Sequence, residues 1–183
     1  MRGGRFGRPF DRREKVPPEV LDRAGLSRGD KVLAHAPTTD GCWLLGTRDA
    51  LVVVDPLETV RVPWERVETA DWDREQDQLR VAEVGEFGQV RPVHTFTVTE
   101  PGQLLVLVRE RVTASVLLQR RVPLVGRKGM LVVARRPPRG LGDITWSLEL
   151  DAGLDPDDPD VREAAAAGLA RVQDELGPGA ART

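Results

Sequence analysis

The chain has few of the side chains on which cross-linking, metal binding and much of catalysis depend. Its 183 residues include one cysteine, two histidines and no tyrosine. A single cysteine, Cys42, excludes an internal disulfide and any zinc site built from several cysteines. Chains without disulfides are typical of a reducing compartment, so we expect a cytoplasmic protein. The same scarcity predicts a protein without a metal ion or other cofactor.

Long hydrophobic runs are also missing. The longest, Ala50–Val54 and Leu104–Val108, fall far short of the roughly 20 apolar residues that a membrane-spanning helix needs. Basic residues near the N-terminus are not followed by an apolar core, which argues against a secretory signal. We therefore predict a protein that does not insert into a membrane.

The net charge of −2 argues against a protein that binds polyanions over its whole surface. The charges are unevenly distributed, however. Residues 119–139 carry basic side chains and no acidic one, whereas residues 149–175 are mainly acidic. The basic segment can bind a nucleic-acid backbone, an acidic protein surface or the acidic segment of its own chain. The sequence leaves these alternatives open.

Seven short segments with strand character follow one another in the first half of the chain, after a short predicted helix over residues 17–24. Several of them alternate apolar and polar residues, and Gly, Pro and Asp separate them at turns. These segments span residues 31–36, 42–46, 50–54, 59–62, 67–72, 79–84 and 91–98. Short strands that turn residues separate at such regular intervals predict an antiparallel sandwich or barrel.

The hydrophobic period then changes from two residues to four. After Thr99, a predicted N-cap, apolar residues recur at every fourth position from Leu104 to Val116. Pro123 is expected to end this helix, because proline is not tolerated in a helix interior. A helix of this length, about 27–30 Å, is long enough to cap one end of a small barrel.

A smaller unit follows the helix. It has two predicted strands, Met130–Ala134 and Asp143–Leu150, and a predicted helix over Val161–Leu176. Asp158 is the expected N-cap of that helix, with Pro159 at its first position. A hairpin and one helix are too small to fold alone, so this ββα unit is expected to dock onto the barrel.

The predicted fold class is therefore α+β. A seven-stranded antiparallel barrel with its capping helix is expected over residues 16–124, and the ββα extension over residues 125–177. Residues 1–15 are expected to form a flexible basic tail and residues 178–183 a second tail.

Several of these stretches resemble bacterial pleckstrin-homology-like (PH-like) domains. Gly29–Leu33 resembles the Gly-acidic pair and first strand of such domains, and Cys42–Leu51 resembles the hairpin that follows. Arg61–Val67 is similar to the next strand and turn, and the whole chain, including Arg109–Ser115, resembles an actinobacterial family. The resemblance covers residues 29–120 and implies a PH-like barrel.

PH-like folds bind phosphoinositides or peptides, or assemble with themselves, so the resemblance alone does not give a function. Members that bind phosphoinositides carry several basic residues in the loop between the first two strands. In this chain that loop, Pro37–Gly41, has no basic residue. The resemblance therefore implies that phosphoinositide binding is not expected.

No pattern of catalytic residues is evident. Gly25–Gly29 (GLSRG) matches the spacing of a hydrolase nucleophile elbow. A predicted helix precedes this segment and a strand follows it, however, which is the reverse of the order that the motif needs. We expect a chance match and a protein that is not an enzyme.

The predicted function is a non-catalytic cytoplasmic interaction or adaptor module that binds a protein partner, with self-association left open. Its predicted contact residues are Trp64 and Arg61 at an open sheet edge, and the basic side chains Arg121, Arg135, Arg136 and Arg139. An exposed Trp64 would be a natural anchor for a partner. The alternative is a nucleic-acid-associated protein that uses the basic segment 120–139.

Overall fold

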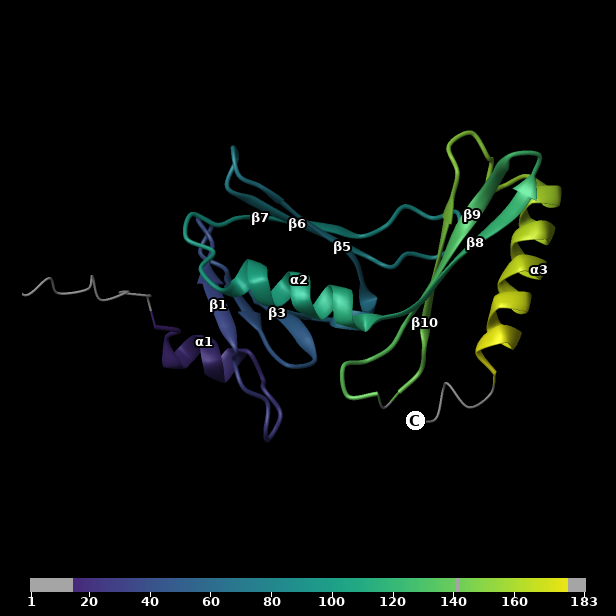
Figure 1. The fold of residues 1–183 in the computed structure, drawn as a ribbon. Coiled ribbons are helices and arrows are strands. Elements are labelled where there is room, and N and C mark those ends of the chain that lie inside the picture. The colour runs from purple at the N-terminus through teal and green to yellow at the C-terminus, as the bar shows by residue number, and fades with distance from the viewer. Residues whose placement is uncertain (1–14, 141, 178–183) are drawn as a thin grey trace, which may run out of the picture.

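The structure is a computed structural model that describes residues 15–140 and 142–177. The predicted tails, apart from Lys15, lie outside the described residues. The described chain has an α+β fold with three antiparallel sheets and a C-terminal helix. Figure 1 shows two sheets with helix α2 in one part of the molecule and the third sheet with helix α3 in the other. We call these parts the N-terminal unit (residues 16–115) and the C-terminal unit (residues 116–177).

All seven predicted strands are present in the N-terminal unit. The first sheet has the order β1-β2-β3-β4 and the second has the order β5-β6-β7. The strands of the first sheet are β1 (Ala34–Pro37), β2 (Trp43–Gly46), β3 (Ala50–Val54) and β4 (Thr59–Pro63). Those of the second are β5 (Val67–Asp73), β6 (Gln78–Glu83) and β7 (Val93–Thr97). Within residues 15–140 and 142–177 the two sheets stay separate and no closed barrel is found, so the predicted seven-stranded barrel is not confirmed.

The main hydrophobic core lies between these two sheets and helix α2 (Leu104–Ser115). Leu104, Leu107 and Val108 of α2 are buried in it. The helix packs so closely that a Cβ atom added at Gly46 of β2 would lie 2.5 Å from the Leu107 side chain. The short helix α1 (Pro18–Arg23) covers the outer face of the first sheet through a second, smaller cluster.

Helix α2 is shorter than the sequence predicts. It begins at Leu104 after Gln103 as N-cap, not after Thr99, and it ends at Ser115 instead of Pro123. Residues Val116–Val125 form strand β8, which pairs with β9 (Lys128–Arg135). β8 is an edge strand with an irregular register around Pro123, and such a position tolerates a proline because no sheet hydrogen bond is lost on the open side.

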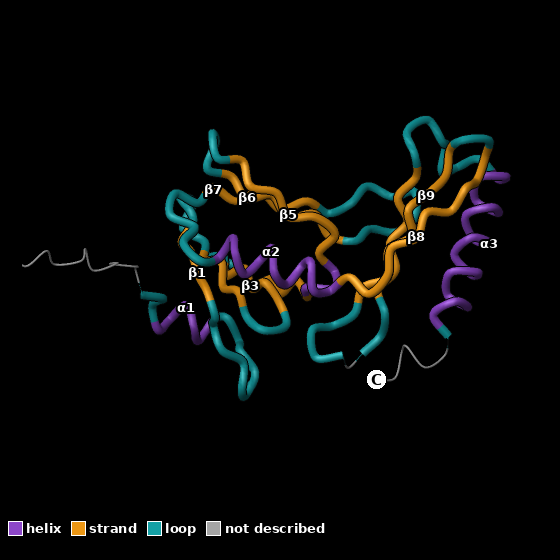
Figure 2. Tube along the Cα trace, in the orientation of Figure 1, coloured by secondary structure: helices purple, strands orange, loops and turns teal. Residues whose placement is uncertain are grey.

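The C-terminal unit is therefore a βββα arrangement, one strand larger than the predicted ββα extension. Its sheet has the order β10-β9-β8, with β10 over Thr145–Leu150. Helix α3 (Pro159–Leu176) covers one face of this sheet, as Figure 2 also shows. The predicted N-cap is confirmed, because the Asp158 carboxylate accepts hydrogen bonds from the backbone N–H groups of Asp160 and Val161.

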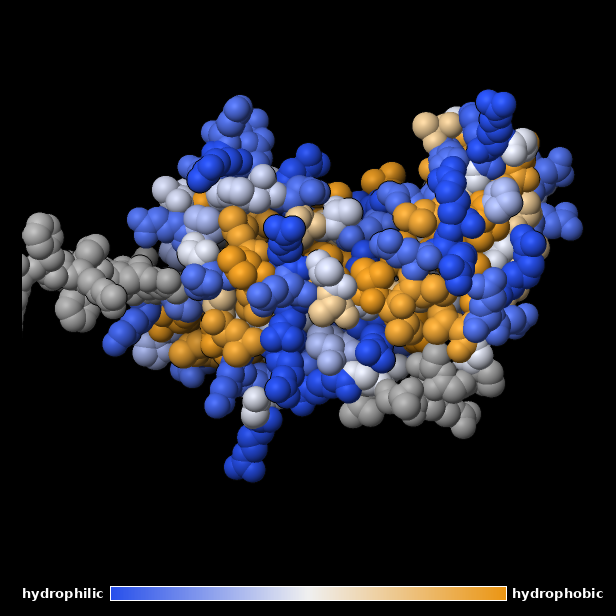
Figure 3. Space-filling model, in the orientation of Figure 1, coloured by the Kyte–Doolittle hydropathy of each residue, from blue (hydrophilic) through white to orange (hydrophobic). Residues whose placement is uncertain are grey.

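Hydrophobic and charged side chains are interspersed on the surface. On the face viewed in Figure 3, orange hydrophobic areas lie on both sides of a blue hydrophilic strip that runs down the N-terminal unit. Single exposed apolar residues, such as Val106 of α2, are normal on protein surfaces. No helix in the described part of the chain is both long enough and apolar enough to span a membrane.

Candidate functional site

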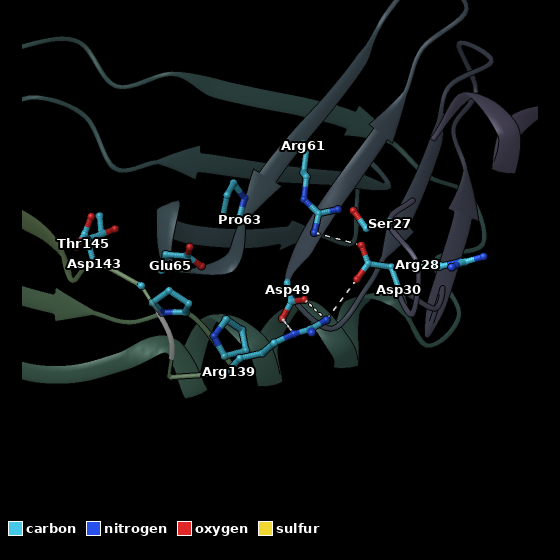
Figure 4. Close-up of a pocket in the computed structure, with 13 residues that line it drawn as sticks. Ser27, Arg28, Asp30, Asp49, Arg61, Pro63, Glu65, Arg139, Asp143 and Thr145 are labelled. Atoms are coloured by element: carbon cyan, nitrogen blue, oxygen red, sulfur yellow. Dashed lines mark hydrogen bonds and ion pairs between the residues drawn. The ribbon is translucent and has the colours of Figure 1, made fainter. Parts of the chain in front are cut away.

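A groove of about 640 Å³ lies where the N-terminal and C-terminal units meet. Its walls come from residues 27–30 before β1, Asp49 in the β2–β3 turn, and the end of β4 with the 3₁₀ turn η1 (Trp64–Arg66). The opposite wall is the loop from β9 to β10, including Pro137, Arg139 and Asp143. Figure 4 shows side chains from these distant segments converging on one open space. We call it the junction groove.

Two carboxylates and two arginines form an ionic cluster in the junction groove. Arg139 donates to Asp49, with Nε 3.1 Å from Oδ1 and Nη2 2.7 Å from Oδ2. The same Nη2 lies 3.4 Å from Oδ1 of Asp30, and Nη2 of Arg61 lies 3.6 Å from the other Asp30 oxygen. Asp30 therefore lies within ion-pair distance of both Arg61 and Arg139, two of the predicted contact residues.

Local turns hold the two carboxylates in place. The Thr47 hydroxyl accepts hydrogen bonds from the backbone N–H groups of Asp49 and Ala50, which fixes the tight β2–β3 turn. The Asp49 carbonyl in turn accepts from the Trp64 N–H, at 3.1 Å. Asp30 lies in a second turn, in which its N–H donates to Ser27 O. The aspartate side chains therefore project from constrained backbone.

A third acid, Glu65, faces the junction groove without an ion pair among the described residues. Its Oε2 atom is buried and has no hydrogen-bond partner within the described chain. Burial raises the pKa of the Glu65 carboxyl, and the nearby charge of Asp49 raises it further. The junction groove therefore contains the carboxyl groups of Asp30, Asp49 and Glu65, which can accept charge-assisted hydrogen bonds from a cationic group.

Trp64 does not lie on the surface. It is 0% exposed, and its Nε1–H donates to Thr47 O at 3.1 Å. The expectation of an exposed tryptophan anchor is wrong, because the η1 turn carries the chain from the first sheet to the second and directs this indole into the core between them. Trp64 is therefore a core residue and not a contact residue, whereas its neighbours Pro63 and Glu65 line the junction groove.

Arg135 is buried as well, at 5% exposed. Its guanidinium donates to Val112 O and Ser115 Oγ at the end of α2, and to Glu68 O in β5. Burial lowers the pKa of Arg135, and the charge of Glu68 opposes that shift. Arg135 thus satisfies backbone acceptors at the end of a helix, where a cation is favoured, and it lies inside the protein rather than on a contact surface.

The remaining basic residues of the segment are dispersed. Arg121 pairs with Asp151, and Arg120 lies 3.2 Å from Glu175 of α3. Two of the cations are therefore paired with the acidic segment of the same chain, which was one of the three alternatives. Arg136 is exposed and has no ion pair with any described residue. Only Arg61 and Arg139, of the six predicted contact residues, line the junction groove.

Ser27 lines the groove, but α1 precedes it and β1 follows, so the order that the nucleophile elbow requires is absent. Within the described ranges, no group of three or more His, Cys, Asp and Glu residues could hold a metal ion.

The chain matches no protein-family model, and no curated protein has a significantly similar sequence.

Sequence analysis missed Asp30, Asp49 and Glu65 as site residues. Each is an isolated acid in a turn, and nothing in its local sequence separates it from an ordinary solvated side chain. The sequence offers no signal for them, because the seven basic side chains of residues 119–139 are outnumbered by the nine acidic ones of residues 149–175 and so require no acid elsewhere.

Proposed function

We propose that this chain is a non-catalytic cytoplasmic interaction module with PH-like architecture. Support for the PH-like relationship comes from the element order: a four-stranded and a three-stranded antiparallel sheet, followed by a helix that packs between them. The single cysteine supports the cytoplasmic location. Cys42 is buried and hydrogen-bonded to Asp55, as expected of an inert thiol and not of a nucleophile.

The junction groove is the contact surface in this proposal. The observation that carries it is the convergence of Asp30, Asp49, Arg61 and Arg139, from four segments of the chain, on one open groove. Charged side chains at the rim of a contact surface select partners by complementary charge. The partner is a protein, and the proposal includes self-association, in which the partner is a second copy of this chain.

The experiment is a pull-down of the tagged chain from its native lysate, with and without nuclease. Asp49→Lys reverses a charge in the junction groove, and Glu75→Lys, in the exposed turn between β5 and β6, is the matched control. We expect a nuclease-resistant protein, captured in stoichiometric amount by the wild type and by Glu75→Lys but not by Asp49→Lys.

Two outcomes would contradict this proposal. Equal capture by all three chains would mean that the partner binds elsewhere. Recovery of RNA or DNA that is lost at moderate salt would favour the alternative, nucleic-acid association through residues 120–139, because phosphate contacts weaken steeply with salt.

A further inference from the structure

Asp30 is a buried carboxylate whose charge is only loosely compensated. Its side chain is 5% exposed, whereas those of Arg139 and Arg61 are 47% and 41% exposed. The two arginine nitrogens lie 3.4 and 3.6 Å from the carboxylate oxygens, beyond the 2.7–2.9 Å of a strong charge-assisted hydrogen bond. A buried carboxylate is costly unless it is well paired. A cation that came closer to Asp30 than these two arginines would therefore bind favourably.

Arg139 reaches this carboxylate pair from the other unit. It belongs to the β9–β10 loop, 90 residues from Asp49 and 109 from Asp30 in sequence. Figure 4 shows its side chain extended along the groove, with dashed lines to both aspartates. Because the Arg139 side chain is 47% exposed, its bidentate pair with Asp49 is accessible to solvent and to a competing cation. Arg139 nevertheless demonstrates that a guanidinium fits between Asp30 and Asp49.

We propose that Asp30 and Asp49 form a receptor for an arginine side chain of a partner protein, and that Arg139 is an internal occupant which the partner's arginine displaces. This inference rests on the proposed function, because it names the ligand of the same groove. Two carboxylates on different segments suit the planar fork of a guanidinium better than a lysine ammonium. Glu65, whose Oε2 has no hydrogen-bond partner among the described residues, provides a further acceptor in the same groove.

The test compares two small probes. N-acetyl-arginine amide carries the guanidinium, and N-acetyl-citrulline amide is its neutral isostere. Each is titrated into ¹⁵N-labelled full-length wild type, Arg139→Gln and the Arg139→Gln/Asp49→Asn double variant, while the amide signals of residues 49 and 65 are followed. Arg139 is half-exposed, so its replacement leaves the core intact; thermal unfolding checks the double variant.

We expect the arginine probe to bind Arg139→Gln about two- to fivefold more tightly than wild type, because the internal competitor is gone and an exposed ion pair is worth about that factor. The citrulline probe is expected not to saturate, and the added Asp49→Asn change is expected to weaken arginine binding at least as much as the first change strengthened it.

Equal affinity of wild type and Arg139→Gln would overturn the competition, and equal binding of the two probes would overturn the receptor for a cation. These failures are distinct from failure of the proposed function. A partner that is lost with Asp49→Lys, together with absent probe binding, keeps the function and removes the arginine receptor. Saturable probe binding without any captured protein keeps the arginine receptor and removes the proposed function.

Discussion

Replacing Arg135 with methionine tests whether this side chain joins the two units or contacts a partner. Methionine keeps most of the apolar stem and removes the guanidinium, which donates to Val112 O, Ser115 Oγ and Glu68 O. These acceptors belong to the N-terminal unit, whereas Arg135 is the last residue of β9. The substitution therefore leaves three polar groups of one unit without their donor from the other.

The size of the effect follows from these contacts. An acceptor left unsatisfied in the interior costs about 1–3 kcal/mol. Removing the guanidinium also removes the cost of burying its charge, which is the reason that the pKa of Arg135 is lowered. Val112 O keeps its hydrogen bond from Ser115 Oγ, so the loss is counted for Glu68 O and Ser115 Oγ alone. Taking the low end for each of these two, we expect the free energy of unfolding to fall by about 2 kcal/mol. In a chain of this length, that corresponds to a Tm lower by roughly 4–8 °C.

Urea unfolding followed by circular dichroism measures this change, and Arg136→Met is the matched control. Arg136 is the neighbouring, exposed arginine, so its replacement is expected to change the free energy of unfolding by no more than about 0.5 kcal/mol. A loss below about 1 kcal/mol in Arg135→Met would refute the structural role. If that variant kept its stability and lost a captured partner, Arg135 would be a contact residue, as the sequence predicts.

Three further predictions concern single side chains. Burial raises the pKa of the Cys42 thiol to about 11, so iodoacetamide at pH 8 is expected to label the native protein far more slowly than the urea-unfolded one; equal rates would contradict its burial. The folded state raises the pKa of Glu65, so its stabilising contribution is complete below the ordinary value of about 4.3 and is lost as the pH rises through the raised pKa. Glu65→Gln is therefore expected to be more stable than wild type at pH 7, with the difference vanishing below about pH 4 in urea titrations; a difference that persisted at low pH would rule out titration of Glu65 as its cause. A Cβ added at Gly168 of α3 would lie 2.7 Å from Val122 and 2.8 Å from Met130, so Gly168→Ala is expected to lower the free energy of unfolding by about 1–3 kcal/mol although alanine favours helix; a stabilised variant would show that the helix can shift away from β8.

Local patterns predicted most of the secondary structure and failed where pairing between distant segments decided it. The seven strands and the Asp158 cap follow from alternation and from the preference of aspartate for the N-cap, both of which are short-range properties. Val116–Val122 contains no proline or glycine that would end the preceding helix, and its valines also suit a strand. Pairing with β9 decides in favour of the strand, and that partner lies beyond the reach of a local pattern.

The same reasoning explains which site residues could be found. Arg61 stands out by its place at a predicted open sheet edge and Arg139 by its place in the basic segment 120–139, and both line the junction groove. The prediction that Trp64 is exposed is wrong because a residue that follows a strand end can face either the solvent or the core. Only the packing of the second sheet decides which of the two it faces. Asp30 and Asp49 become a pair only through the fold, since 18 intervening residues, including all of β1 and β2, separate them. The placement of Arg139 between them depends on docking of the C-terminal unit. A change that weakens that docking, such as Arg135→Met, is therefore expected to alter the junction groove as well as the stability.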